Sequence, residues 1–296
     1  DVEHPLRRAP FVERDELARG EAAVMMEQAP RQRALHERAG TFIIPNPWDI
    51  GSARLLADAG YEALATTSAG YAWSRGKPDG GISRDEMLAH CAEIVAATPL
   101  PVNADLENCY AHEPAGVAET IRLAGATGLA GASIEDSTGD AAKPIYDFDL
   151  AVERVRAGIA ANRALAVPML ICARAENFLN GRKDLADTIK RLQAFEAAGA
   201  DVLYAPGLWA IEEIRTVINA VNRPVNVLVS SGNPDLTLAE LQAAGAKRIS
   251  VGGGLARAAY GELLRAAKEI KDKGVFTYVK SAPPAPVLNN GFAKWD

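Results

Sequence analysis

Cysteine is scarce in this chain, which has three of them among 296 residues. Cys91, Cys109 and Cys172 stand far apart and form no CxxC pair. Secreted domains that depend on disulfides carry more cysteines, usually in an even number. A sparse, odd set is typical of reduced thiols, so we expect a cytoplasmic protein without a disulfide framework.

Positive charge and long apolar runs are lacking as well. The formal net charge is −6 and the pI is near 5.4, and no dense run of Lys and Arg interrupts this balance. Proteins that bind nucleic acid usually carry a basic patch, and a membrane-spanning helix needs about 18 apolar residues in a row. Neither pattern occurs, nor does a basic-then-apolar leader. We therefore predict a protein that binds neither nucleic acid nor a membrane.

The two ends of the chain differ from its middle. Residues 1–38 are charged and broken by Pro5, Pro10 and Pro30, and we expect a helical N-terminal extension without chemistry. A natural start at Met25 or Met26 is one interpretation of this segment. Residues 276–296, with "APPAPV" at their centre, indicate either an extended arm wrapped around a neighbouring subunit or an unstructured tail. The catalytic domain is then expected over residues 39–275.

Between these ends, short apolar runs alternate with longer amphipathic segments. Eight such pairs predict a closed (β/α)8 TIM barrel. An open doubly wound sheet is the alternative, but its glycine-rich loop is missing after the first run, which is followed by "IPNPWD". The predicted strands are Thr41–Ile44, Ala63–Thr67, Pro101–Ala104, Gly128–Ile134, Pro168–Ala173, Val202–Tyr204, Val225–Val229 and Arg248–Val251. The predicted helices are Ile50–Ala59, Ser83–Ala97, Pro114–Leu123, Leu150–Asn162, Leu185–Ala198, Ala210–Asn219, Leu236–Ala243 and Leu255–Lys271.

Charged residues recur where consecutive strands should end, which is where barrel enzymes place their chemistry. A single carboxylate there is often a solvated loop residue or a brace, and Asp136 is open to that interpretation. Clustered like charges repel one another unless a cation compensates them, so a cluster indicates a site. The residues at the ends of strands two to five are Asp79, Asp105, Glu107, Glu135, Asp136, Arg174 and Glu176.

The types of these residues limit which metal ions and which catalytic mechanisms the site is suited to. Oxygen ligands without His or Cys favour Mg²⁺ or Mn²⁺ over Zn²⁺, and Arg174 is suited to clamp an anionic substrate through two N–H groups. The strand ends offer no lysine for a Schiff base. His112 and Cys109 lie near the acidic pair but have no identifiable catalytic partner, and "VGGGLA" after strand eight is interpreted as a tight turn.

Five motifs, taken together, point to a known family. "AGYEALATTSAG", "GKPDGG", "VNADLENCY", "GASIEDS" and "ICARAENF" occur in this order and resemble the isocitrate lyase/phosphoenolpyruvate mutase superfamily from Arg33 to about Tyr260. The resemblance implies a (β/α)8 barrel, usually tetrameric, whose last helix is swapped between subunits. It also implies Mg²⁺ and a substrate that is a 2-oxo acid or yields one by C–C or P–C cleavage.

The resemblance also implies roles for individual residues. Asp105 corresponds to a direct metal ligand and lies against the substrate. Arg174 corresponds to the arginine that contacts substrate and stabilises an enolate, and Glu176 to an acid that supports the metal shell from outside. The segment that holds the substrate carboxylate corresponds to Thr67, Ser68 and Ala69. The acids of the metal shell, of which Glu135 and Asp79 also serve catalysis, are Asp79, Asp105, Glu107 and Glu135.

Departures from the family pattern leave the reaction open. The lyases carry a K-K/R-C-G-H loop after strand four, but "EDSTGDAAKPIYDFD" has neither cysteine nor histidine. The asparagine-bearing gating loop of the mutases is not evident either. Pro206 stands where the mutases have histidine, and Cys109 where the family usually has glycine.

The leading hypothesis is therefore a Mg²⁺-dependent lyase that cleaves a C–C bond in a small 2-oxo or 2-hydroxy dicarboxylate through an enolate. Decarboxylation of an oxaloacetate-like acid is its simplest version, since it needs no base to start. A phosphonopyruvate mutase or hydrolase and a non-catalytic 2-oxo-acid binding protein are the alternatives. A homo-oligomer, tetramer or dimer, is expected in each case.

Overall fold

The computed structural model describes residues 27–295, and residues 27–37 form a helix. The interpretation of Met25 or Met26 as a natural start lies outside the described residues, as does most of the predicted N-terminal extension. The division of the chain into residues 1–38, 39–275 and 276–296 stays a prediction. None of the described helices is both long enough and apolar enough to cross a membrane.

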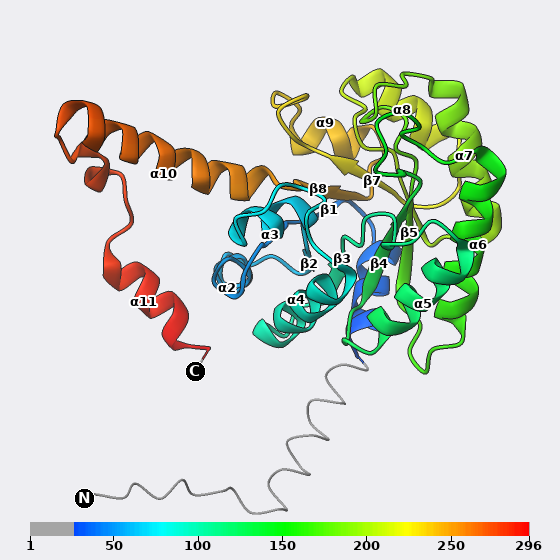
Figure 1. The fold of residues 1–296 in the computed structure, drawn as a ribbon, viewed down its shortest axis with the longest axis horizontal. Helices are drawn as coiled ribbons and strands as arrows, with labels where there is room; N and C mark the ends of the chain where they lie inside the picture. The colour runs from blue at the N-terminus through cyan, green and yellow to red at the C-terminus, as the bar shows by residue number, and fades with distance from the viewer. Residues whose placement is uncertain (1–26, 296) are drawn as a thin grey trace, which may run out of the picture.

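Eight parallel strands form one sheet that curls into a nearly closed barrel (Figure 1). Their order is β1-β8-β7-β6-β5-β4-β3-β2, so β2 to β8 pair in chain order and β1 pairs with β8. The backbone N–H of Ala65 donates to the carbonyl oxygen of Pro45 at 3.0 Å, which links the two end strands. The predicted (β/α)8 barrel is confirmed. The strands are β1 (Phe42–Ile44), β2 (Leu64–Ala65), β3 (Val102–Ala104), β4 (Gly131–Glu135), β5 (Leu170–Arg174), β6 (Val202–Tyr204), β7 (Val225–Leu228) and β8 (Arg248–Ser250).

The helices that follow the strands cover the outside of the barrel (Figure 1). One helix, α3 (Ser68–Ser74), lies in what the sequence predicts as a long loop after the second strand. It forms because Thr67 caps it, the hydroxyl accepting from the N–H of Gly70 at 3.2 Å. The others lie close to the predicted positions: α2 (Ile50–Asp58), α4 (Arg84–Ala97), α5 (Pro114–Gly125), α6 (Phe148–Arg163), α7 (Leu185–Ala198), α8 (Ile211–Asn219), α9 (Leu238–Ala243) and α10 (Gly254–Lys273).

Alternation along the strands separates an apolar outside from a polar inside. Side chains such as Leu64, Val102 and Ile134 belong to the main apolar core together with residues of the helices. Their neighbours in the strands, such as Asn103 and Ser133, point the other way and line a cavity inside the barrel. The helix over residues 27–37 contributes Leu35 to a second, small cluster with β1 and β2, which places this helix at the N-terminal end of the barrel.

A single buried side chain, Asn46, fastens the seam between the two end strands. Its amide nitrogen donates to the carbonyl oxygen of Thr66 at 2.9 Å. Its oxygen accepts from the backbone N–H groups of Val251 at 2.9 Å and Gly252 at 2.8 Å. The segment after β1 is therefore bonded to the segments after β2 and β8.

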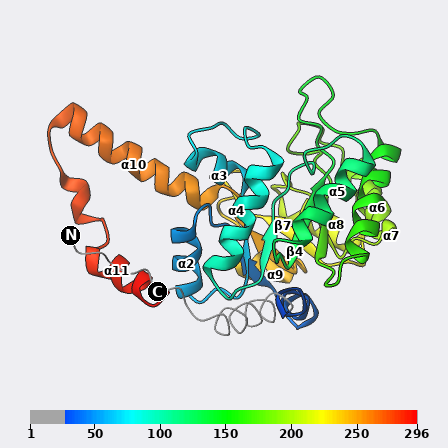
Figure 2. The ribbon, with the colours of Figure 1, turned by 60° about the horizontal axis from the view of Figure 1, so that its bottom comes forward.

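Beyond the barrel, α10 extends away from the body and the chain then turns back (Figures 1 and 2). A short 3₁₀ helix, η1 (Thr277–Lys280), is followed by α11 (Ala285–Ala293). The end of α11 lies against α2, where Lys294 forms an ion pair of 2.7 Å with Asp58. The segment is therefore helical rather than unstructured, because the prolines of "APPAPV" stand before and within the first turn of α11, where proline is tolerated. Its role as an arm around a neighbouring subunit stays a prediction.

Replacing Asn46 tests the seam. Asn46→Ala removes three hydrogen bonds and leaves buried backbone groups unpaired, so the free energy of unfolding should fall by about 2–4 kcal/mol. Urea unfolding followed by circular dichroism measures this, with the exposed Asn222→Ala as the control. If the free energy of unfolding fell no further in Asn46→Ala than in the control, Asn46 would not hold the two end strands together.

Candidate active site

A cavity of about 200 Å³ lies inside the barrel at the C-terminal ends of the strands. Its mouth includes Thr67, Ser68 and Ala69 at the start of α3, and Asp79 from the loop that follows α3. Deeper positions come from residues that point inward from the strands. These are Asn103, Ser133, Cys172, Tyr204, Asn226, Arg248 and Ser250. The cavity is therefore where the sequence predicts the chemistry of a barrel enzyme.

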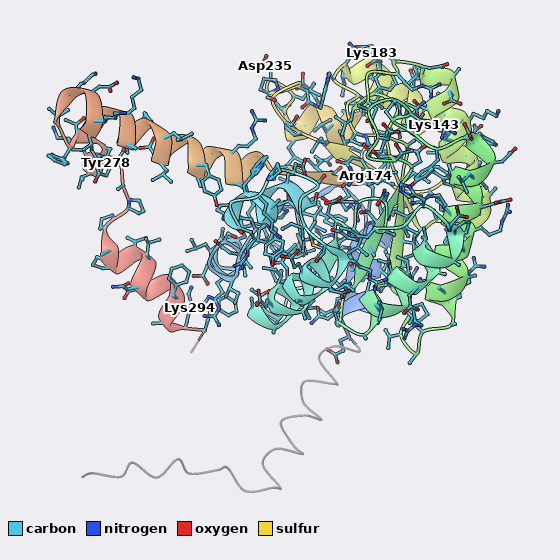
Figure 3. All side chains as sticks on the ribbon, viewed as in Figure 1. Lys143, Arg174, Lys183, Asp235, Tyr278 and Lys294 are labelled. Atoms are coloured by element: carbon cyan, nitrogen blue, oxygen red, sulfur yellow. The ribbon has the colours of Figure 1, made fainter. Side chains whose placement is uncertain are left out.

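Arg174, the last residue of β5, is the centre of the charged part of the site. Figure 3 shows its position within the barrel. Its guanidinium forms three ion pairs, with Asp105 at 2.8 Å, Glu135 at 3.0 Å and Glu176 at 2.7 Å. Each pair uses a different nitrogen. An arginine has five N–H groups, so two remain for a ligand in the cavity that Arg174 lines.

Burial and charge shift the acid–base equilibria of these groups. Burial works against ionisation of Arg174, but Glu176, Glu135 and Asp105 raise the pKa of its guanidinium well above the usual range. Burial also raises the pKa of Glu135 and of Glu176, while Arg174 opposes that shift in both. The arginine therefore stays charged and makes it less costly to keep the acids together.

Asp105 links the arginine to the start of α3. Its second carboxylate oxygen accepts from the backbone N–H of Ser68 at 3.1 Å and from the Ser68 hydroxyl at 3.0 Å. Its own N–H donates to the Thr66 hydroxyl at 2.9 Å. The predicted carboxylate-holding segment and the predicted metal ligand are thus in direct contact.

The loop after Asp105 has an unusual backbone. Glu107, Cys109 and Tyr110 have φ angles of 50°, 59° and 55°, values that cost most residues about 1–2 kcal/mol each. Cys109 stands where the family usually has glycine, and this φ explains that preference. Burial raises the pKa of the Cys109 thiol to about 12, so the thiol is not ionised near neutral pH.

Arg154 on α6 holds this loop in place. The guanidinium donates to the carbonyl oxygens of Asn108 and His112, both at 2.7 Å, and to that of Ala111. The Cys109 carbonyl accepts from the Thr120 hydroxyl at 2.7 Å. Tertiary hydrogen bonds therefore compensate for the local conformation.

Two predicted metal-shell acids, Glu107 and Asp79, have no positively charged partner in the structure described here. Burial, with the charges of Asp105 and Asp79, raises the pKa of Glu107 to about 7. Burial and Asp105 also raise the pKa of Asp79. One carboxylate oxygen of Glu107 is buried without a hydrogen-bond partner. This unbalanced negative charge is what a cation would neutralise.

The arrangement of the acids distinguishes between kinds of metal ion. Over residues 27–295, no three His, Cys, Asp or Glu side chains converge into a closed cage. A cage of that type suits Zn²⁺, whereas Mg²⁺ usually keeps several waters and uses one or two carboxylates. The carboxylates present therefore suit Mg²⁺ held largely through water better than Zn²⁺.

Asp136 has a bracing role, the alternative that the sequence left open for it. Its carboxylate accepts from the backbone N–H of Glu176 at 2.7 Å and from Arg191 at 2.9 Å. It therefore fixes the position of Glu176 behind Arg174. The loop that starts at Asp136 is a short hairpin in which Ser137 bridges Ile145, and residues 139–143 at its tip are exposed. His112 is hydrogen-bonded to Tyr146 at 2.7 Å.

Sequence reasoning missed the deeper cavity residues, including Asn46, Tyr204, Asn226 and Arg248. A signal was present, because polar residues occupy every second position in several buried strands, as in "RIS" and "VNV". In a barrel, such positions face the interior together. Of the nine predicted site residues, six line the cavity and are Thr67, Ser68, Ala69, Asp79, Asp105 and Arg174. Glu135 and Glu176 form ion pairs with Arg174, which lines the cavity. Glu107 interacts through its charge with Asp105 and Asp79.

Comparison with known proteins agrees with this geometry. The family model described as phosphoenolpyruvate phosphomutase matches residues 32–271. A solved structure from Burkholderia cenocepacia J2315, assigned only to the lyase/mutase class, has a TM-score of 0.89 and 56% identity over 92% of this chain and 97% of that one.

Other similar proteins have named activities, and two of them are described here. The solved structure of 2,3-dimethylmalate lyase has a TM-score of 0.78 and 27% identity, over 90% of this chain and 94% of that one. The oxaloacetate decarboxylase of Paraburkholderia xenovorans (strain LB400) is 30% identical over 217 residues, which is 70% of each chain. One relative is thus named a lyase and the other a decarboxylase.

The raised pKa of Glu107 makes the stability of the metal-free protein depend on pH. The pKa is about 7 in the folded protein against an ordinary value of 4.5, so between these values the folded protein holds a proton that the unfolded chain has released. The free energy of unfolding then falls as the pH rises through this interval. Glu107→Gln should remove this pH-dependent contribution. The free energy of unfolding of the variant, minus that of wild type, should therefore rise by about 1–3 kcal/mol from pH 5 to pH 8.

Urea unfolding with excess chelator at several pH values measures this difference. The exposed Glu113→Gln serves as the control, for which no such rise is expected. A pH dependence in Glu107→Gln equal to that of wild type would show that Glu107 titrates normally.

Proposed function

The chain belongs to the isocitrate lyase/phosphoenolpyruvate mutase superfamily and is an enzyme of its lyase and mutase class, and on that premise we propose a Mg²⁺-dependent lyase that cleaves a C–C bond in a small 2-oxo or 2-hydroxy dicarboxylate. Decarboxylation of oxaloacetate is the version to test first. The observation that carries the proposal is Arg174, held by three carboxylates with two N–H groups left for a ligand.

The metal would be held by Asp105, with Asp79, Glu107 and Glu135 acting through water. Mn²⁺ satisfies the same oxygen ligands. Bound Mg²⁺ would supply Lewis-acid polarisation of the 2-oxo group. The raised pKa values of Glu107 and Asp79 support this assignment, because a nearby cation would relieve the repulsion among these acids.

The chain's own residues would bind and orient the substrate. The backbone N–H of Ala69, at the cavity mouth, would hold the carboxylate next to the 2-oxo carbon. The Ser68 N–H and hydroxyl, which donate to Asp105 in the structure, would hold that acid beside it. Arg174 would donate to the oxygen on which the enolate charge develops. When the C3–C4 bond breaks, C4 leaves as CO₂ and the electron pair of that bond stays behind to form the enolate. C3 then takes a proton from water to give pyruvate.

The hairpin after β4 favours this reaction over those that need a proton-handling loop. Its residues include neither a thiol nor an imidazole, and loss of CO₂ needs no base to begin. Cleavage of the P–C bond of phosphonopyruvate is the second candidate within the superfamily. Turnover of phosphonopyruvate without turnover of oxaloacetate would favour it, and tight binding without turnover of either would favour a binding protein.

We also propose that the chain forms a homo-oligomer, a tetramer or dimer, through α10 and the segment after it. Leu263, Leu264 and Phe276 are 61%, 70% and 62% exposed, and α10 stands clear of its own barrel (Figure 2). A second copy is the occupant that the family's swapped last helix implies. The cytoplasmic location stays a prediction.

The first test is pyruvate release from oxaloacetate in the presence of Mg²⁺. Wild-type enzyme should exceed a blank with metal alone, because free divalent metal decarboxylates oxaloacetate only slowly. Asp105→Ala should return the rate to the blank, since it removes the proposed ligand. A wild-type rate equal to the blank would refute the decarboxylase version.

A second test concerns Arg174. Arg174→Ala should lower kcat by a factor on the order of 10²–10³, as for other donors to a developing oxyanion. Arg174→Lys keeps a positive charge near the three acids but lacks the paired N–H donors of the guanidinium. It therefore controls for loss of the acid cluster through charge repulsion alone. Full turnover in folded Arg174→Ala would show that the mechanism is wrong.

A further inference from the structure

A second guanidinium lies deeper in the same cavity. Arg248 begins β8, is 3% exposed and lines the cavity inside the barrel. It donates from Nε to the Asn226 side-chain oxygen at 2.8 Å, and from its other two nitrogens to the Asn103 oxygen at 3.3 Å and the Cys172 sulfur at 3.2 Å. All these acceptors are neutral.

The other buried arginines differ in this respect. Arg174 has three carboxylates, and Arg191 has Asp136 and Asp187. Arg154 lacks a carboxylate but donates to three backbone carbonyls and does not line the cavity. Of the described residues, none forms an ion pair with Arg248. A buried charge without a counter-charge is unfavourable, so the floor of the cavity attracts an anion.

Of the residues that the structure describes, those beneath Arg248, His36 and Gln32, carry no negative charge. The helix over residues 27–37 places His36 near the floor, where burial and then the charge of Arg248 lower the pKa of His36 to about 3. Gln32 from the same helix is fully buried, and neither its side-chain oxygen nor its nitrogen has a hydrogen-bond partner. A Cβ on Gly131 would lie 2.6 Å from the Asn103 oxygen and 3.0 Å from the Gln32 oxygen, so only glycine leaves Asn103 its place beside Arg248.

We propose that Arg248 binds the distal carboxylate of the substrate and thereby selects dicarboxylates over 2-oxo acids with an apolar end. This rests on the proposed function, in which the other end of the substrate lies at Asp105 and Arg174. The acids occupy the mouth and Arg248 the floor, so a ligand anchored at the mouth extends toward the unpaired cation. Arg248 is a specificity-determining residue in this arrangement.

The role has a kinetic signature. A carboxylate that leaves as CO₂ loses its charge in the transition state, so Arg248 stabilises bound oxaloacetate more than the transition state. Arg248→Met should therefore raise KM for oxaloacetate by about 10- to 100-fold, the range for a charge-assisted hydrogen bond, with kcat unchanged or higher. A merely structural residue would lower kcat and leave substrate preference intact.

Binding provides a test that does not depend on turnover. Calorimetry with Mg²⁺ compares two pairs of equal length that differ in the distal carboxylate, 2-oxoglutarate with 2-oxopentanoate and malate with 2-hydroxybutyrate. Oxalate, which occupies the mouth alone, is the reference ligand. Wild type should prefer the dicarboxylate at least about tenfold in one pair. Arg248→Met should abolish the preference, Arg248→Lys should keep part of it, and the exposed Arg163→Met should keep all of it, with oxalate affinity equal throughout.

Each outcome decides the proposal. Equal wild-type affinity within both pairs would overturn it even if Arg248→Met does not fold, and so would an undiminished preference in folded Arg248→Met. Pyruvate release without dicarboxylate preference would refute the role of Arg248 alone. Dicarboxylate preference that depends on Arg248, without pyruvate release, would support this role and refute the decarboxylase version of the function.

Discussion

The site depends on one interaction, the triple ion pair of Arg174 with Asp105, Glu135 and Glu176. These residues come from the ends of three adjacent strands and the loop after the last of them. Without the guanidinium the acids would repel one another in a buried setting. The barrel supplies the geometry, because parallel strands bring their C-terminal ends to one rim, and the arginine makes the resulting concentration of negative charge tolerable.

A polar barrel interior follows from the same design. Inward positions carry Asn103, Tyr204, Asn226 and Arg248, and Arg248 donates to the side-chain oxygens of Asn226 and Asn103 across the barrel. The apolar core lies instead between the strands and the surrounding helices. Stability and ligand binding are therefore assigned to opposite faces of the same strands, and a residue's place in the alternation decides which task it has.

The sequence was sufficient for the barrel and for the charged rim, since both depend on local patterns: alternating runs, and acids directly after them. It was insufficient for α3, because residues 68–74 have a sequence equally compatible with a loop and only the capping by Thr67 indicates a helix. It also missed Asn46 and Arg248, whose importance depends on which strands meet across the barrel. The helical conformation of α11 escaped prediction because prolines suggest extended chain unless the start of a helix accommodates them.

The left-handed residues Glu107, Cys109 and Tyr110 have a consequence for what determines the shape of their loop. An isolated segment would avoid this conformation, and the carbonyl contacts from Arg154 and Thr120 exist only once α5 and α6 have packed. The loop that carries Glu107 therefore depends on α5 and α6 for its native shape. The strands thus place Glu135 and Arg174 in the acidic rim, whereas the place of Glu107 depends on the surrounding helices.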